Sequence, residues 1–460
     1  MTGADFLQLD RAGVPRGGLS TWLGTSVRAA IADGRLPIGS PLPSTRRLAD
    51  DLGVSRGVVV EAYQRLVDEG LAVAGGARGT RVAAAPAPAG PDPAPPAPAR
   101  LDLSPGIPDL SAFPRAAWSQ AERAVLAGAG AADLGYGDPR GHLVLRRVLS
   151  AWLGRTRGVR AAADDVVVVA GVAQALALLA RVLAARGSTV VGVEDPGSRG
   201  IREQVAQWGL RPVPVPVDRD GVDVAALRRG PARVVLLTPA HQFPTGVVLS
   251  PRRRRAVLEW AAAGGLVVED DYDAEHRYDR TPVPALQGMA PAHVVHTGSV
   301  SKTLAPALRI GWLVGPPGLR EELTAVKQAT DLGNPALPQL TFAHLLSSGA
   351  FERHLRRVRA RQRARRDAML AALNEHLPGA RVHGIAAGLH LLVTFPDAYD
   401  DVALAAQASE AGVLVQPLSQ HRIAPGPPGL VLGYAAHPAD RIREGVARLG
   451  RAVGRPGRRT

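Results

Sequence analysis

The chain has 460 residues, 46% of them hydrophobic and 21% charged, a composition typical of a folded protein with roughly two to four domains. It contains no cysteine, which excludes disulfides, thiolate zinc sites and cysteine nucleophiles. The net charge is +14, yet residues 1–83 hold only 10 arginines against 8 acidic groups, so charge alone does not locate a nucleic-acid-binding surface.

Neither a membrane segment nor a leader peptide is expected. The most apolar run, residues 166–180, is short, contains Gly171 and Gln174 and is followed by Arg181. The N-terminal MTGADFLQLD lacks the basic and apolar regions of a signal peptide. We therefore expect a cytoplasmic protein.

Residues 1–83 carry three helical patterns followed by two short strands. The first helix is predicted to end within 34–44, the second to follow Ser44 as its N-cap, and the third to follow Ser55 and cover 56–69. The residues predicted to face inward are Leu23, Val27 and Ile31 on the first helix, and Val59, Ala62, Tyr63 and Leu66 on the third. Residues 71–83 indicate two strands around a glycine-rich tip. This spacing favours a helix-turn-helix with a wing, the alternative being a generic three-helix interaction module.

The segment GRLPIGSPLPSTRRLADDLGVSRGVVVEAYQRLVDEGL, residues 34–71, resembles the winged helix-turn-helix domain of GntR-type transcription regulators. The resemblance implies binding to double-stranded DNA at promoters. The residues that it assigns to DNA are Arg46, Ser55 and Arg56, with Arg78 and Gly79 at the tip of the wing. Gly57 and Val58 stand where the family often has threonines, so the family's base preference is not carried over.

Residues 84–100, rich in proline and alanine, offer nothing for a core and are predicted to form a semi-extended tether. After them, short β-branched runs alternate with helical patterns, which indicates an α/β fold for residues 101–460. The runs are continuously apolar, as expected for a mostly parallel sheet covered by helices on both faces. They are residues 166–169, 190–193, 234–237, 266–269, 294–297 and 310–314.

In open α/β sheets ligands collect at the carboxyl ends of strands, and Lys302, one of only two lysines, follows such an end. Unlike arginine, an amine can lose its proton near neutrality and condense with an aldehyde, so Lys302 is a candidate Schiff-base lysine. Pyridoxal 5′-phosphate would also need an anion at its pyridine nitrogen, a donor to its 3-oxygen, and amides and hydroxyls around its phosphate. The candidates are Asp270, Tyr272, the amides of 171–174, Ser299 and Arg309.

A hard-cation site is the alternative use of the carboxylates at 270, 271, 273 and 275. No phosphate-binding P-loop accompanies them, which disfavours this alternative, and we expect no metal.

Six segments resemble a fold-type I, pyridoxal phosphate-dependent aminotransferase domain: YGDPRGHLVLRR, VVAGVAQAL, VEDPGSRG, LLTPAHQFPTGVVLS, VVEDDYDAEHRY and TGSVSKTLAPALRIGWLV. Joined behind a GntR-type winged helix, such a domain defines the MocR/PdxR-like bacterial regulators. The resemblance implies an aldimine between the cofactor and Lys302. The other cofactor-binding residues that it implies are Asp270 at the pyridine nitrogen, Tyr272 at the 3-oxygen, Ser299, Arg309, Val172 and Ala173 at the phosphate, Tyr136 reaching the phosphate from the other subunit of a homodimer, and His241 and Gln242 lining the pocket near the ring.

Two departures from aminotransferases bear on activity. Ser198 stands where relatives often carry a ring that stacks on the cofactor, and Val431 stands where aminotransferases place an arginine that clamps the substrate carboxylate. We therefore expect a transcription regulator that senses pyridoxal phosphate, or an amine or amino acid reacting with it at Lys302, rather than a turnover enzyme. The alternatives are a working aminotransferase with a non-essential N-terminal domain, and an architectural DNA-binding dimer that binds no cofactor.

Overall fold

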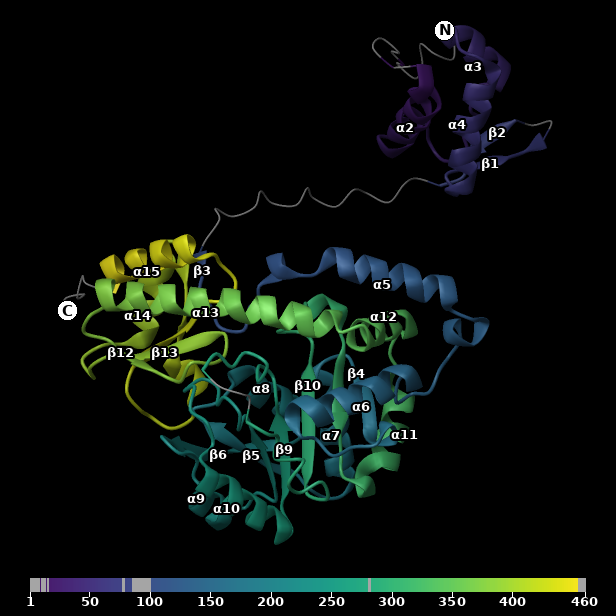
Figure 1. Ribbon diagram of the computed structural model, residues 1–460. Coiled ribbons are helices and arrows are strands. Elements are labelled where there is room, and N and C mark those ends of the chain that lie inside the picture. Colours follow the sequence, from purple (N-terminus) through teal and green to yellow (C-terminus); the bar gives the residue numbers. More distant parts are fainter. Residues whose placement is uncertain are drawn as a thin grey trace. The chain divides into compact units, whose positions relative to one another are not determined.

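The chain folds as two units, Met1–Ala97 and Pro98–Thr460 (Figure 1). The computed structural model describes residues 9, 14, 16–76, 79–84, 101–279 and 283–453. Arg78 and all but the first residue of the predicted tether 84–100 lie outside these residues.

The N-terminal unit contains the three predicted helices and the wing. Its elements are η1 (Arg16–Gly18), α2 (Leu19–Ala32), α3 (Thr45–Leu52), α4 (Arg56–Asp68), β1 (Ala72–Ala74) and β2 (Thr80–Val82). All seven residues predicted to face inward are buried, because each lies on the face that its helix turns toward the other two. The strands pair antiparallel, with Val73 opposite Arg81.

The two predicted caps differ in their outcome. The Ser44 hydroxyl accepts a hydrogen bond from the Arg47 amide at 3.3 Å and so caps α3, which ends at Gly53 in the left-handed conformation, with φ 60°. Ser55 occupies the N-cap position of α4, but its hydroxyl makes no capping bond. Ser55 therefore precedes the helix, but its side chain forms no hydrogen bond with the helix backbone.

An eight-stranded sheet forms the centre of the second unit, in the order β4-β11-β10-β9-β8-β5-β6-β7. The strands β10, β9, β8, β5 and β6 run parallel to one another, which confirms the mostly parallel sheet. The bounds are β4 (Val166–Val169), β5 (Val190–Asp195), β6 (Arg211–Asp218), β7 (Gly221–Val222), β8 (Val234–Leu237), β9 (Leu266–Asp270), β10 (Val294–Ser299) and β11 (Gly311–Val314).

Helices cover both faces of this sheet because successive side chains of a strand point to opposite faces. In β4, Val166 and Val168 pack with α6 and α12, whereas Val167 and Val169 pack with α7. The helices are α5 (Arg115–Gly128), α6 (Leu143–Arg157), α7 (Val172–Ala185), α8 (Arg199–Gln207), α9 (Val224–Arg229), α10 (Pro251–Ala262), α11 (Arg320–Asp331) and α12 (Ala336–Ser347). No helix among the described residues is both long and apolar enough to cross a membrane.

A second, four-stranded sheet lies beside the large one, in the order β12-β13-β16-β15 (Figure 1). The helices α13, α14 and α15 share its hydrophobic core, and β3, the first strand after the predicted tether, pairs with β14 against the same core. The bounds are β3 (Leu101–Asp102), β12 (Arg381–His383), β13 (His390–Thr394), β14 (Val413–Leu414), β15 (Gln416–Pro417), β16 (Gly429–Gly433), α13 (Ala350–His376), α14 (Asp401–Glu410) and α15 (Ala439–Val453).

Candidate functional site

The predicted DNA-binding side chains lie together at the start of two helices. Arg46 is in the first turn of α3, and Ser55 and Arg56 begin α4; all three are exposed. Arg56 donates to the Thr45 hydroxyl at 3.3 Å, and neither Arg46 nor Arg56 has a carboxylate partner within the described part of the unit. By contrast, Arg28 and Arg65 pair with Glu69 and Glu61, each at 2.5 Å.

This difference in pairing leaves positive charge at the N-terminal end of α4, where a recognition helix contacts bases and phosphates. Gly79, at the tip of the wing, is exposed and has φ +75°, a conformation suited to glycine. The structure thus gathers Arg46, Ser55 and Arg56 on α3 and α4 and sets Gly79 between the strands of the wing.

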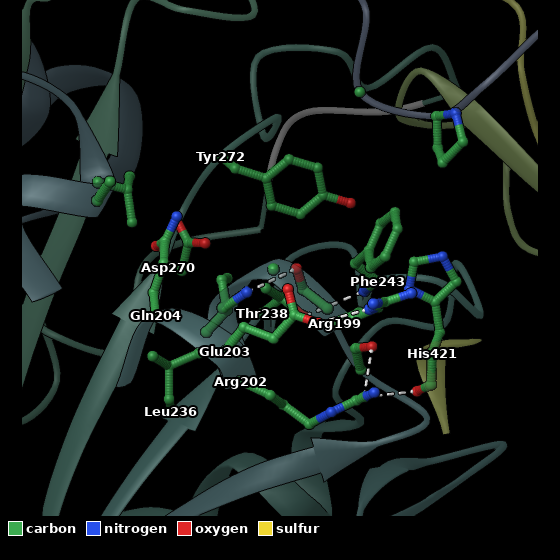
Figure 2. Close-up of a pocket in the computed structure, with 18 of the residues that line it drawn as sticks. Arg199, Arg202, Glu203, Gln204, Leu236, Thr238, Phe243, Asp270, Tyr272 and His421 are labelled. Atoms are coloured by element: carbon green, nitrogen blue, oxygen red, sulfur yellow. Dashed lines mark hydrogen bonds and ion pairs between the residues drawn. The ribbon is translucent and has the colours of Figure 1, made fainter. Parts of the chain in front are cut away.

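A cavity of about 580 Å³ opens at the carboxyl ends of the parallel strands of the second unit (Figure 2). Seven of the predicted cofactor residues line it: Val172, Ala173, Asp270, Tyr272, Ser299, Lys302 and Arg309. They come from four separate strand ends, which the sheet order brings to one edge.

The candidate reactive groups Lys302 and Asp270 both line the cavity. Burial lowers the pKa of Lys302, which favours the neutral, nucleophilic amine. The Lys302 amine donates a hydrogen bond to the carbonyl oxygen of Gly106. Burial, together with the charges of Asp271 and Asp273, raises the pKa of Asp270 to about 7, and its Oδ1 is buried without a hydrogen-bond partner. This oxygen is therefore available to an N–H donor on a ligand.

The other end of the cavity is suited to a dianion. The amides of Val172 and Ala173 are in the first turn of α7, where helix geometry leaves N–H groups without helical partners. Gly171 precedes them at φ +95°, and a Cβ at this position would lie 3.3 Å from Nη1 of Arg309. Ser299 and Arg309 face the same space. The glycine therefore makes room for the arginine beside the helix N-terminus.

Three predicted residues lie outside the cavity wall. His241 and Gln242 are buried behind it rather than lining it: Gln242 donates to the carbonyls of Pro196 and Phe243, and His241 contacts Asp273. Their bonds to the protein explain the difference, because these polar groups are already used. Tyr136 is 92% exposed and does not line the cavity of its own chain.

The opposite wall comes from residues that the sequence did not indicate. Phe243 and His421 stand there, as Figure 2 shows, together with His390 of β13, Gln416 of β15 and Gln420. Arg202 crosses this wall and donates to the carbonyls of His421 and Gln420 at 2.9 and 2.8 Å. Pro105 and Gly106 also line the cavity, and these lining residues come from segments that are distant from one another in the sequence.

The two departures from aminotransferases have distinct structural roles. Ser198 caps α8 by accepting from the Ile201 amide at 3.3 Å. Val431 is fully buried in a cluster with Leu392 and Leu418 and does not line the cavity. Of the arginines on the cavity wall, Arg199 pairs with Glu203 at 2.6 Å, and Arg202 holds backbone carbonyls. Val431 therefore supplies no carboxylate clamp, and Arg199 and Arg202 already have partners within the protein.

The carboxylates of the cation-site alternative point to different partners. Asp271 receives two hydrogen bonds from the buried Arg157, at 2.6 and 2.9 Å, and Asp273 receives one from His241 at 2.8 Å. Asp270 alone of these three is directed into the cavity. A buried lysine amine, an orphaned carboxylate oxygen and a helix N-terminus with a space-making glycine are the groups that pyridoxal phosphate requires, so the residues fit this cofactor.

Comparisons with known proteins identify both units. The family model "Aminotransferase class I and II" matches residues 100–449, and "Bacterial regulatory proteins, gntR family" matches residues 21–82. The chain is 33% identical to the probable rhizopine catabolism regulatory protein MocR of Rhizobium meliloti, covering 96% of this chain and 95% of that protein. It is also 33% identical to the pyridoxine biosynthesis transcriptional regulator PdxR of Corynebacterium glutamicum, covering 95% and 96%.

Solved structures show the same fold for the second unit. LysN, the α-aminoadipate aminotransferase of Thermus thermophilus in complex with N-(5′-phosphopyridoxyl)-L-leucine, matches with a TM-score of 0.71 and 29% identity, covering 77% of this chain and 92% of that one. The family resemblance in the sequence is thus confirmed at full length. The chain belongs to the MocR/PdxR-like subfamily of GntR-type transcription regulators, in which a winged helix-turn-helix is joined to a fold-type I, pyridoxal phosphate-dependent aminotransferase-like domain.

Proposed function

We propose that this regulator senses pyridoxal phosphate, or an amine or amino acid that reacts with it, through Lys302, and that occupancy of the site controls DNA binding. Residues 1–83 read promoter DNA, residues 84–100 act as the tether, and residues 101–460 hold the ligand. The cofactor supplies an aldehyde that condenses reversibly with amines. Because promoter DNA lies in the bacterial cytoplasm, the proposal also locates the protein there.

The observation that carries the proposal is the bond between Lys302 and the segment that follows the tether. The amide of Leu101 donates to the carbonyl of Gly412 and that of Leu103 to the carbonyl of Leu414, each at 2.9 Å, which pairs the segment with β14. The carbonyl of Leu103 also accepts from the amide of Gly433, at the end of β16 in the second sheet, at 2.7 Å. Three residues later, the Gly106 carbonyl accepts from the Lys302 amine. A ligand that occupies this amine competes with the bond, so its binding energy acts on the first residues beyond the tether.

A homodimer is part of the proposal. Tyr136 is 92% exposed, and the neighbouring Leu134 and Leu126 are 65% and 55% exposed. Exposed apolar side chains concentrated on one stretch are typical of an interface. In the dimer, Tyr136 would reach the phosphate site of the partner, and two winged helices would bind DNA together.

The direct test of the site uses the two lysines of the chain. We expect borohydride reduction of the protein with pyridoxal phosphate to leave a pyridoxyl adduct on Lys302 in peptide mass spectra. Lys327 is the internal control, because its amine is buried and bonds Asp331 and Asn334 at 2.7 and 2.6 Å. An unmodified Lys302 would contradict the proposal. Steady transamination that is lost in Lys302→Ala would instead support the working aminotransferase.

A further inference from the structure

The solvent-facing side of α4 carries two residues that have no polar atom in their side chains, Gly57 and Val60. Gly57 is exposed, and Val60 is 45% exposed, although four other residues of α4 are buried in the core of the unit. The two positions are three residues apart, so they are neighbours on one face of the helix. Both lie in the first two turns of α4, the part of a recognition helix that contacts base edges.

The folded unit does not require a glycine at position 57. Outside the helix backbone and the adjoining residues, a Cβ there would contact only the Ser55 hydroxyl oxygen among the described residues, at an ordinary 3.8 Å. Glycine is less favourable than alanine inside a helix, so Gly57 weakens α4 without relieving a clash. The close approach of a molecule from outside the unit would account for it.

The polar side chains that follow on this side of α4 are bonded within the helix. Glu61 accepts a hydrogen bond from Arg65 at 2.5 Å, and Gln64 donates one to Asp68 at 2.8 Å. Both pairs join residues four apart, so they lie along the helix surface. Val60 stands beside them with methyl groups only, and its side chain can therefore make only apolar contacts.

The surroundings of Gly57 and Val60 favour a polyanion over an apolar protein surface. Arg46 and Arg56 are exposed and have no carboxylate partner within the described part of the unit. Burying such charges against an apolar surface would be costly, whereas DNA phosphates bind them. Because α4 lies within the residues that match the gntR family, double-stranded DNA is the partner that fits this face.

The major groove of DNA contains one apolar group, the 5-methyl of thymine. A valine side chain contacts such a methyl group favourably, and a glycine three residues earlier lets the helix backbone come close to the bases. Cytosine at the same position would present an amino donor, which Val60 could not satisfy. An apolar pair at the start of a recognition helix therefore distinguishes thymine from cytosine.

We propose that Val60 is a specificity-determining residue that contacts the 5-methyl group of a thymine in the major groove, and that Gly57 permits the close approach this contact needs. The inference rests on the part of the proposed function in which residues 1–83 bind promoter DNA. It is independent of the cofactor. Arg56 supplies charge beside this contact but no apolar surface.

The first test removes single methyl groups from the DNA. The full-length protein selects duplexes from a random library, and each invariant thymine of the selected site is replaced by uracil, which lacks only the 5-methyl group. In anisotropy titrations, wild type is expected to lose about fourfold in affinity at the contacted thymine, the value of one buried methyl group. Val60→Ala should bind the thymine and uracil duplexes equally. Val402→Ala, at a valine of α14 that is 53% exposed, is the matched control and should discriminate as wild type does.

The second test uses the opposite signs expected for Gly57→Ala. This variant should unfold at the same or a higher temperature than wild type, because alanine favours the helix, yet bind the selected site about tenfold more weakly, because its methyl group obstructs the DNA. Gly154→Ala in α6 is the matched control. Gly154 is exposed, and a Cβ there would lie at an ordinary 3.6 Å from the Val159 carbonyl oxygen, so this variant should leave DNA affinity unchanged.

Several results would overturn the inference. They are failure to select any site, a selected site without an invariant A·T pair, equal wild-type affinity for every thymine and uracil duplex, and an undiminished uracil effect in Val60→Ala. Unchanged DNA affinity in Gly57→Ala would refute the close approach. If Val60→Ala does not fold, Val60→Thr, which keeps one methyl group, should show a smaller uracil effect than wild type. All titrations are made without pyridoxal phosphate, so a lack of response to the cofactor, which would contradict the proposed function, is seen separately.

Discussion

At the scale of single residues, the cavity depends on how closely side chains can approach the backbone at Gly171. This glycine has φ +95°, and a Cβ at this position would lie 3.3 Å from Nη1 of Arg309, so the absence of a side chain leaves space for the guanidinium. Arg309 itself adopts the left-handed conformation, φ 50°, which is uncommon for a residue with a side chain. Two adjustments of the backbone thus bring one cation to the N-terminus of α7, where a phosphate would be held.

Gly171→Ala should therefore have a larger effect on the affinity for pyridoxal phosphate than on the free energy of unfolding. We expect the affinity for pyridoxal phosphate to fall about tenfold, with a loss of stability of about 1 kcal/mol from the strained φ. Gly187→Ala is the matched control, because Gly187 has φ +80° but nothing within 4 Å of a Cβ. Fluorescence titration and thermal unfolding measure the two effects. Equal affinity losses in both variants would contradict the account.

Sequence predicted residues best where the chemistry is local. Lys302, Asp270 and Tyr272 stand at strand ends and could be assigned from the words that contain them. Gln242 could not, because its amide is used by carbonyls of Pro196 and Phe243 that only the folded chain brings near. The capping of α4 failed for a similar reason: the residue type was suitable, but the Ser55 side chain makes no bond to the helix.

At the scale of elements, the continuous valine runs predicted the central sheet because both of its faces are covered by helices. Strand β6, Arg211–Asp218, was not predicted, since prolines alternate through it. It pairs with β5 along one side, and on the other side only Val217 and Asp218 pair with the two-residue β7. Most of that second side has no partner strand, so prolines, which lack an N–H group, are tolerated there. The second sheet was not predicted, because its strands are short and come from segments that are separated in the sequence.

The element that links site and tether is the segment 101–110. In the apo protein we expect it to be protected from deuterium exchange, and more exposed in Lys302→Ala, which lacks the bond to Gly106. Pyridoxal phosphate should raise exchange severalfold in wild type and leave Lys302→Ala unchanged. Lys327→Ala, at the other lysine, controls for general destabilisation. Exchange that is insensitive to cofactor in wild type would argue against the relay.

At the scale of the whole molecule, the two units carry different groups: exposed arginines in the N-terminal unit and a buried lysine in the second. In the described part of the N-terminal unit, Arg46 and Arg56 have no carboxylate partners, whereas Arg28 and Arg65 are paired. The second unit holds the buried amine of Lys302, whose pKa is lowered by burial. Family membership joins these two activities in one chain. Our central claim is that occupancy at Lys302 changes how the protein binds DNA, by no more than the difference in ligand affinity between the two states.

The most direct test is fluorescence anisotropy on the intergenic DNA upstream of the protein's own gene, with and without pyridoxal phosphate. We expect specific binding by wild type whose affinity shifts with cofactor, a weak or absent response in Lys302→Ala, and a loss of about tenfold or more in Arg56→Ala but not in the matched Arg65→Ala. Specific binding that does not respond to cofactor or to an amine, with the same affinity in wild type and Lys302→Ala, would contradict the coupling.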